Sequence, residues 1–307
     1  MILAPMQGLT EVIFRRVYEH CFPGAIPLAV SPFIALTRNL RFSTDNAQIR
    51  DILPENNRGS IPVIPQILGK EPDEFVLLAN HLYDLGYSEV NWNMGCPMRA
   101  VTAKHRGCGL MPYPDEVKTI LDHVIPQLQG RLSVKVRLGL KSKDEIFAML
   151  PVLNDYPLSS ITIHPRLGRQ QYTGVPDLDT FGEVLPLTKH PVIYNGDLCT
   201  PDDIRRIRLR FPQVADIMVG RGILYRPTLP LEIASAEISP HATNRFIRCL
   251  MDAIDTTIPT DESRIRKKKE YWSLLWKALP ISELQARQVL RAQELTAVDK
   301  LIDSLTQ

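Results

Sequence analysis

Short apolar segments alternate with longer amphipathic ones along most of the chain, and this alternation constrains the fold more than any other feature. Segments rich in Val, Ile and Leu predict eight strands, at residues 2–6, 28–33, 62–68, 89–93, 133–138, 160–164, 192–195 and 216–219. Patterns between them predict helices at residues 71–85, 115–128, 143–153, 180–187 and 201–211. Strands alternating with helices over about 230 residues fit an α/β fold of the (β/α)8 TIM-barrel type.

An open doubly wound sheet is the alternative, but no Gly-x-Gly-x-x-Gly follows the first predicted strand. After about residue 240 the strand segments stop, and the pattern predicts helices at residues 244–256, 261–279, 282–292 and 296–305. Ser239, Pro240 and His241 interrupt the pattern between the two parts. We therefore expect a barrel domain at residues 1–238 and a small helical domain at residues 239–307.

Composition is ordinary for a soluble globular protein, with 44% hydrophobic and 23% charged residues among 307. Met1 leads directly into an apolar segment without the basic region of a signal peptide, and no apolar segment is long enough to span a bilayer. We expect a cytoplasmic protein without a membrane partner. Five widely spaced cysteines lack a Cys-x-x-Cys pair, so neither a disulfide framework nor a metal site is indicated.

Basic residues are concentrated in two places, although the net charge is only +2. Residues 264–269 contain five cations in six positions, and Arg205, Arg206, Arg208 and Arg210 form a second cluster. A polyanionic partner is one interpretation, and a solvated helix face is the other.

Cys96 lies between Gly95 and Pro97, just after a predicted strand. Glycine frees the backbone and proline fixes the next φ angle, so the thiol is expected on a stiff turn at the end of a strand. Such a position suits a reactive group, although a buried structural cysteine in a turn is the alternative.

Polar residues follow seven of the predicted strands, and in a barrel the carboxyl ends of the strands form the active site. They are Gln7 after the first strand, Gln66 on the third, Asn93 and Cys96 on the fourth, Lys135 and Arg137 on the fifth, His164 and Arg166 on the sixth, Asn195, Gly196 and Asp197 on the seventh, and Gly220 and Arg221 on the eighth. Each has a structural alternative, such as a loop cap for Gln66 or a core histidine for His164. Together they predict a single active site at the mouth of the barrel.

The last two strand ends are rich in glycine and carry an arginine, which suits a phosphate group. Lys135 and Arg137 alternate with valines and therefore point to one face of their strand. Two cations directed into a barrel interior require an anion or strong acceptors. Flavin mononucleotide (FMN) meets both demands, with its phosphate at the last strands and its pyrimidine edge beside Lys135.

The whole set of motifs, in this order and spacing, resembles the tRNA-dihydrouridine synthases. The motifs are Ala-Pro-Met at residues 4–6, Asn-Met-Gly-Cys-Pro at 93–97, Lys-Val-Arg at 135–137, His-Pro-Arg at 164–166, Asn-Gly-Asp at 195–197 and Gly-Arg-Gly at 220–222. The resemblance spans the chain and implies an enzyme in which NADPH, or NADH, reduces FMN. The reduced flavin then gives a hydride to C6 of a tRNA uracil flipped out of the RNA fold.

The resemblance also implies roles for individual residues. Cys96 would be the general acid that protonates C5. Asn93 would hold the uracil edge, with Arg137 and Arg166 as further substrate contacts. For FMN, it implies a backbone wall at Pro5, Met6 and Gln7, pyrimidine-edge contacts from Gln66 and Lys135, a flanking contact from His164, and a phosphate cradle at Asn195, Gly196, Asp197, Gly220 and Arg221.

Two departures from the family pattern are visible. The usual His-Gly-Arg-Thr reads His164, Pro165, Arg166 and Leu167, and the segment after the catalytic loop brings a second thiol, Cys108, near the first. We interpret Cys108 as a small-residue substitution, with a share in the acid or redox role as the alternative.

The helical C-terminus is expected to bind tRNA. Arg266, Lys267, Lys268 and Lys269 would contact phosphates, and the adjacent Tyr271 and Trp272 would stack on RNA. The local pattern resembles the branch that modifies position 16 of the D-loop, another D-loop uridine being the alternative. We expect a monomer. A barrel that reduces a free pyrimidine, or an RNA-binding protein without chemistry, would not need this combination of a basic helical domain with Cys96, Asn93 and Lys135.

Overall fold

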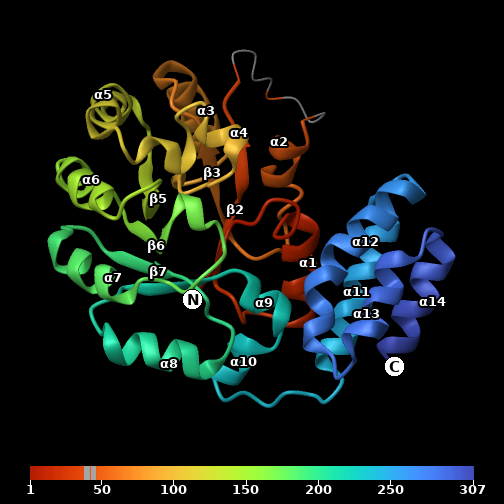
Figure 1. Ribbon diagram of the computed structural model, residues 1–307. Helices are drawn as coiled ribbons and strands as arrows, with labels where there is room; N and C mark the ends of the chain where they lie inside the picture. The colour runs from red at the N-terminus through yellow and green to blue at the C-terminus, as the bar shows by residue number, and fades with distance from the viewer. Residues whose placement is uncertain (38–41, 43–45) are drawn as a thin grey trace.

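A closed barrel of eight parallel strands forms the body of the protein in a computed structural model that describes residues 1–37, 42 and 46–307. The strands are β1 (Ile2–Leu3), β2 (Leu28–Ala35), β3 (Val63–Leu68), β4 (Glu89–Met94), β5 (Arg131–Gly139), β6 (Ile161–Leu167), β7 (Val192–Asn195) and β8 (Asp216–Val219). Ile2 of β1 lies opposite Leu28 of β2 on one side and Met218 of β8 on the other, which closes the barrel. The predicted TIM barrel is confirmed (Figure 1).

Helices surround this barrel. They are α1 (Val12–Cys21), α2 (Ala47–Ile52), α3 (Pro72–Asp84), α4 (Arg99–Thr102), α5 (Pro114–Val124), α6 (Asp144–Asn154), α7 (Leu178–Val184), α8 (Pro201–Arg210), α9 (Arg221–Tyr225) and α10 (Leu229–Ile233). Of these, α3, α5, α6, α7 and α8 match the five that the sequence pattern predicts. At α8, the Thr200 hydroxyl accepts the backbone N–H of Asp203, and the Asp203 carboxylate accepts the backbone N–H of Thr200. This capping box and Pro201 explain why the helix begins there.

The two faces of the strands have different environments. Outward residues such as Val134 and Val136 join the large core beneath the helices, whereas Ile2, Val30, Ile193 and Met218 form a separate apolar cluster with Ala4. The strand alternation places this second cluster inside the barrel. Hydrogen-bonded polar side chains on β3, β4 and β5 share the interior with it.

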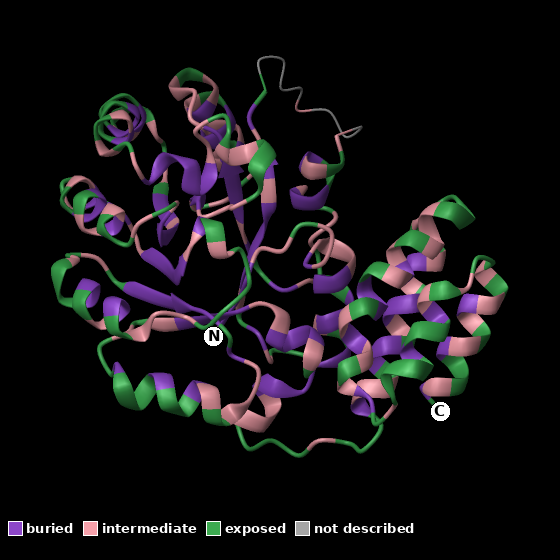
Figure 2. Cartoon of the chain, in the orientation of Figure 1, coloured by how far each residue is buried: buried purple, intermediate pink, exposed green. Residues whose placement is uncertain are grey.

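A bundle of four helices follows the barrel, drawn in blue in Figure 1: α11 (Ala242–Thr257), α12 (Asp261–Leu275), α13 (Glu283–Arg291) and α14 (Leu295–Leu305). The ring of Phe246 on α11 lies 5.7 Å from Phe14 and 5.6 Å from Tyr18, both on α1. The ring of Tyr271 on α12 stacks on Phe14 at 6.2 Å. These buried aromatic residues join the bundle to the barrel in one continuous core. Figure 2 shows buried segments, in purple, where the bundle meets the barrel. None of the described helices is long and apolar enough to cross a membrane.

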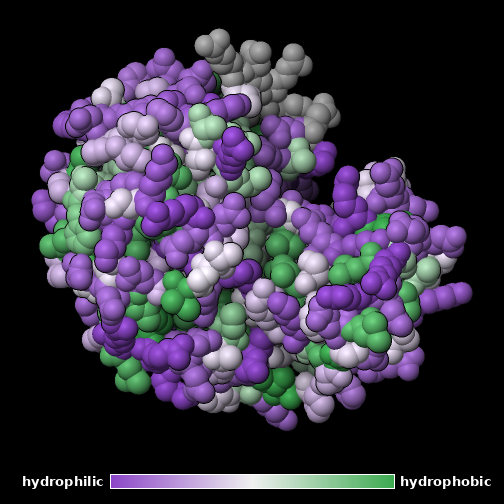
Figure 3. Space-filling view, viewed as in Figure 1, coloured by the Kyte–Doolittle hydropathy of each residue, from purple (hydrophilic) through white to green (hydrophobic). Residues whose placement is uncertain are grey.

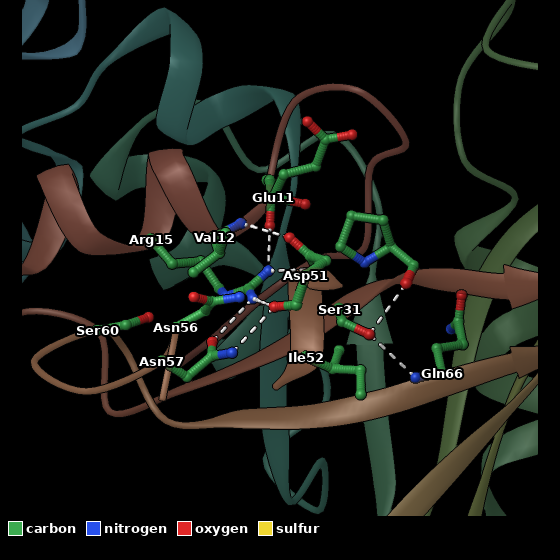
Figure 4. A network of polar contacts seen from close by, with 12 residues as sticks. Glu11, Val12, Arg15, Ser31, Asp51, Ile52, Asn56, Asn57, Ser60 and Gln66 are labelled. Carbon is green, nitrogen blue, oxygen red and sulfur yellow. Dashed lines mark hydrogen bonds and ion pairs between the residues drawn. The ribbon is translucent and has the colours of Figure 1, made fainter. Parts of the chain in front are cut away.

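A buried polar network anchors the loop between β1 and α1 (Figure 4). The Asp51 carboxylate accepts the backbone N–H of Val12 at 2.6 Å, and therefore supplies the cap that Glu11 does not give α1. Arg15 donates to the carboxylate of Asp51 at 3.1 Å and to the carbonyl oxygen of Thr10 at 2.8 Å. The Thr10 hydroxyl in turn accepts the backbone N–H of Met6 at 2.8 Å. This network holds the segment that leads out of β1 at the barrel mouth.

Candidate active site

A cavity of about 650 Å³ opens at the carboxyl ends of the strands. This volume lies within the range of small-molecule and cofactor sites. Its lining includes nearly all of the polar strand-end residues singled out in the sequence: Pro5, Met6, Gln7, Asn93, Cys96, Lys135, Arg137, His164, Asn195, Gly196, Asp197, Gly220 and Arg221. Gln66 and Arg166 are not among the lining residues, and both instead support groups that are.

Cys96 is held on a rigid turn by backbone and side-chain contacts. Its N–H donates to Asn93 Oδ1 at 2.9 Å, and its carbonyl oxygen accepts the N–H of Cys108 at 3.1 Å. Gly107 has a φ of 57°, and a Cβ atom there would lie 2.6 Å from the Cys96 carbonyl oxygen. A residue with a side chain at position 107 would therefore push the turn outward.

The amide of Asn93 is largely used within the protein. Oδ1 accepts the N–H of both Gly95 and Cys96, and Nδ2 donates to Gln66 Oε1 at 2.7 Å. Gln66 is 0% exposed and also donates to Asn91 Oδ1 at 2.7 Å. The amide of Gln66 thus supports Asn93 from one layer deeper in the barrel, and its expected contact with a cofactor stays a prediction.

The thiol of Cys96 is kept in its protonated form. Burial raises the pKa of Cys96 above its ordinary value, and the nearby N–H of Met98 and the charges of Arg137 and Lys135 offset only part of that effect. At neutral pH the group is thus a thiol, which is the form that can donate a proton.

Lys135 is a cation without a partner among the described residues. Burial, together with the like charge of Arg137, lowers the pKa of Lys135 to about 7. A desolvated ammonium group of this kind favours a ligand that brings an anion or strong hydrogen-bond acceptors.

Arg137 connects the turn that carries Cys96 to the loop after β6. Its Nε donates to the carbonyl oxygen of Gly95 at 2.9 Å, and Nη1 donates to those of Leu167 at 3.1 Å and Gln171 at 2.8 Å. Nη2 has no partner among the described residues, and Arg137 lines the cavity. This nitrogen can therefore donate to a ligand.

Tyr172 lies at the mouth between two guanidinium groups. The Cζ atoms of Arg137 and Arg221 lie 5.5 Å and 5.0 Å from the centre of its ring, and the side chain is 56% exposed. These cation–π contacts fix an aromatic face at the edge of the cavity. Sequence reasoning missed Tyr172 because it lies in a loop without periodicity, where its only signal is a tyrosine within a polar segment.

The loops after β7 and β8 require small residues. A Cβ atom at Gly222 would overlap the carbonyl oxygen of Leu198, so the two loops approach each other more closely than any side chain allows. Arg221 donates to Asp197 Oδ1 at 3.0 Å, and Asp197 has a φ of 30°. The close backbone approach and Arg221 make this edge suited to a phosphate group.

A groove of about 1400 Å³ runs between the barrel and the helical bundle, where Figure 3 shows the surface hollowed. Gln7, Pro32 and Phe33 line both the groove and the cavity, so the two lie side by side. The exposed residues Arg16, Arg58 and Arg266 face the groove, and the described part of the chain supplies no ion pair to any of the three. Leu274 of α12, which the sequence did not indicate, reaches the cavity itself.

The family model for dihydrouridine synthase (Dus) matches residues 2–303. The chain belongs to the dihydrouridine synthase family. A tRNA-dihydrouridine(16) synthase of Pseudomonas putida is 30% identical over 76% of the chain and 73% of that protein. One of Aquipseudomonas alcaligenes is 26% identical over 98% of each, and tRNA-dihydrouridine synthase B of Pasteurella multocida is 29% identical over 75% of the chain and 67% of that protein.

Among solved structures the similarity is one of fold. An old yellow enzyme homologue from Zymomonas mobilis superposes with a TM-score of 0.55 at 15% identity, covering 80% of the chain and 91% of that protein. Morphinone reductase gives 0.55 at 11% identity, covering 80% and 88%. The dihydrouridine synthase barrel thus shares its architecture with these TIM-barrel proteins.

Arg166 differs from its expected role as a substrate contact. Its side chain is 1% exposed and does not line the cavity, because it is bonded to His164, Asp197 and the loop at residues 173–174. It therefore has no route to a substrate in this arrangement.

The basic segment of α12 is divided among different surroundings. Lys268 is 1% exposed and paired with Asp255 of α11 and Asp299 of α14, so the predicted phosphate contact is wrong for this residue. Lys267 donates to the carbonyl oxygen of Gly8 at 2.7 Å and to Glu11 at 3.0 Å, which joins α12 to the β1–α1 loop. Arg266 is exposed on the groove, and Lys269 is partly exposed without an ion pair among the described residues.

The prediction that two aromatic residues of α12 stack on RNA is also wrong. Tyr271 and Trp272 are both 0% exposed, and Trp272 Nε1 donates to the carbonyl oxygen of Ala286 at 3.0 Å. They form the core of the bundle instead.

Proposed function

We propose that this chain is an FMN-dependent tRNA-dihydrouridine synthase that uses NADPH to reduce uridine 16 of the D-loop. The observation that carries the proposal is the placement of one protonated thiol, Cys96, on a rigid turn in the same cavity as the unpaired cation Lys135. The family membership and the names of the relatives support the reaction class.

The cavity fits FMN on observations of its own residues. Lys135 offers a donor to the acceptor-rich pyrimidine edge of a flavin. The glycine-dependent approach of the loops after β7 and β8, with Arg221 beside it, offers a cradle to the phosphate. When bound, FMN would supply the hydride for C6 of the uracil.

The chain's own contribution to the reaction is a proton and its position. Asn93 fixes the backbone of Cys96, and burial keeps Sγ protonated until a carbon acceptor arrives. Cys96 would give its Sγ proton to C5, and Lys135 and Arg137 would stabilise the negative charge left on the sulfur. The remaining Nδ2 proton of Asn93 and the Nη2 group of Arg137 would hold the uracil.

The groove supports a tRNA substrate. It adjoins the cavity at Gln7 and Phe33, and Arg16, Arg58 and Arg266 lie along it without an ion pair among the described residues. Positive side chains of this kind bind the phosphate backbone and make affinity dependent on salt. We propose that the protein acts on cytoplasmic tRNA as a monomer.

The choice of uridine 16 follows the names of two relatives, one of them aligned over 98% of both chains. The experiment is to map dihydrouridine in tRNA from cells that lack this protein. Loss at position 16 alone is expected, whereas loss at another D-loop position would reassign the target and an unchanged map would overturn the proposal. Purified protein should also be yellow with bound flavin.

A further inference from the structure

Every N–H donor of Arg166 is used within the protein. Nε donates to the carbonyl oxygen of Thr173 at 3.2 Å, and Nη2 donates to that of Gly174 at 2.7 Å and to Asp197. Nη1 donates to Asp197 Oδ1 at 3.0 Å and contacts His164 Nε2 at 3.1 Å. The five N–H groups of the guanidinium are thus paired with five acceptor atoms, and the guanidinium itself cannot accept a hydrogen bond.

The contact with His164 fixes the position of the imidazole proton. Because an arginine stays protonated and can only donate, Nε2 of His164 must be the acceptor in this pair. The single proton of the neutral ring is then on Nδ1. Nδ1 has no partner among the described residues, yet it is not one of the buried unpaired polar atoms, and His164 lines the cavity. The N–H group is therefore open to a ligand.

The charges around His164 keep its ring neutral. Lys135 and Arg137 face it from β5, Arg166 from its own strand and Arg221 from α9, while the ring of Tyr172 lies 6.4 Å away. The carboxylate of Asp197, which shares Arg166 with His164, is already paired with Arg166 and Arg221. Burial and these cations hold the pKa of His164 well below its ordinary value, so no imidazolium forms at neutral pH.

We infer that Arg166 is a positioning residue that presents His164 to the cavity ligand as a fixed Nδ1–H donor. The same bonds hold the backbone that follows Tyr172 and the carboxylate that orients Arg221. One buried side chain thus sets three groups that face the cavity. The inference deepens the proposed function and rests on it for the identity of the ligand, FMN.

Nitrogen-15 NMR of histidine-labelled protein tests the proton position directly, and His164→Gln identifies the signal of His164. In the flavin-free protein we expect the Nδ1–H tautomer, unchanged between about pH 5.5 and 8.5. Arg166→Met removes the donor and a charge, and should give mixed tautomers with a titration in that range. Arg166→Lys keeps a charged donor and should restore most of the wild-type signal. Arg169→Met is the matched control, because Arg169 is an exposed arginine in the turn directly after β6.

Titration with FMN gives the second measurement. We expect Arg166→Met to weaken FMN binding about tenfold, the scale of one misplaced hydrogen bond, with no change in Arg169→Met. A wild-type signal from an Nε2–H tautomer, or an ordinary titration of His164, would overturn the inference even in an active synthase. Conversely, an Nδ1–H tautomer in a protein that binds no FMN would leave the inference standing and remove the proposed function.

Discussion

The side chain of Asn93 accepts the backbone N–H of Cys96 at 2.9 Å, so the residue expected to hold the substrate also shapes the turn that carries the acid. The same oxygen accepts the N–H of Gly95, and the amide nitrogen donates to the buried Gln66. The order from barrel interior to mouth is therefore Gln66, Asn93 and Cys96. A substitution of Gln66 or Asn93 should therefore shift the position of the Cys96 thiol.

Asn93→Ala removes the acceptor for two backbone N–H groups. Because the turn would lose its fixed form, we expect dihydrouridine formation to fall by about 100-fold, the lower end of what a positioned general acid contributes. Flavin content should stay near that of the wild type, since Asn93 leaves Lys135 in place. Turnover of the Asn93→Ala protein at the wild-type rate would show that the turn is held by Gly107 and Pro97 alone.

Lys135 should make flavin binding depend on pH. Its pKa of about 7 in the ligand-free protein means that the ammonium form predominates below that pH and is lost above it. A ligand that prefers the charged form should bind up to about tenfold more weakly for each pH unit above 7. Riboflavin is the suitable probe because it lacks a phosphate that itself titrates.

The control variants for Lys135 separate its charge from general effects. Lys135→Met should bind riboflavin weakly at all pH values, with a flat profile, whereas the exposed Lys104→Met should reproduce the wild-type slope. Fluorescence quenching on titration into flavin-free protein measures both. A flat profile in the wild-type protein would contradict the role of Lys135.

Tyr172 should contribute to the substrate rather than to the flavin redox step. Tyr172 is 56% exposed while Arg137 and Arg221 lie 5.5 Å and 5.0 Å from the centre of its ring, so we expect its exposed part to stack on a base. Stacking on a base is worth about 1–3 kcal/mol, so Tyr172→Ala should raise the KM for tRNA about tenfold or more. Tyr172→Phe keeps the ring and should behave as the wild type, and steady-state kinetics at saturating NADPH distinguish the two.

Substitutions of Lys268 and of its neighbour Lys269 should have different effects, the first on stability and the second on RNA binding. Lys268→Met leaves Asp255 and Asp299 without their shared cation and should lower the free energy of unfolding by about 3 kcal/mol. Lys269→Met should leave stability unchanged but weaken tRNA binding and reduce its salt dependence. Thermal unfolding and filter binding of both variants measure these effects. Equal thermal stability of the two variants would contradict the buried role of Lys268.

The sequence was sufficient for the barrel because each strand and helix carries its own pattern, and the carboxyl ends of parallel strands converge by geometry. It did not show how deep each polar side chain lies. Gln66 and Arg166 point to the same side of the wall as the cavity residues, but Gln66 lies one layer below the mouth and Arg166 lies behind His164. The alternation along a strand predicts to which face a side chain points, but it does not predict which residues that side chain contacts.

The basic segment of α12 shows an error that periodicity could have prevented. Consecutive residues of a helix point in different directions, so a continuous run of cations cannot form one face. Four residues of α12 are buried: Lys268, and Tyr271, Trp272 and Leu275, which lie three, four and seven positions after it. That spacing marks them as one apolar face with a lysine in it, which carboxylates on neighbouring helices then neutralise.

The most direct test of the central claim uses unmodified tRNA, NADPH and the purified flavoprotein, with dihydrouridine measured by mass spectrometry. Cys96→Ala and Cys108→Ala are compared with the wild type, because Cys108 is a fully buried thiol beside the same turn. The wild-type protein and Cys108→Ala should form dihydrouridine, while Cys96→Ala should retain FMN and NADPH oxidation but lose most of the product. Full product from Cys96→Ala, or none from the wild type, would contradict the account.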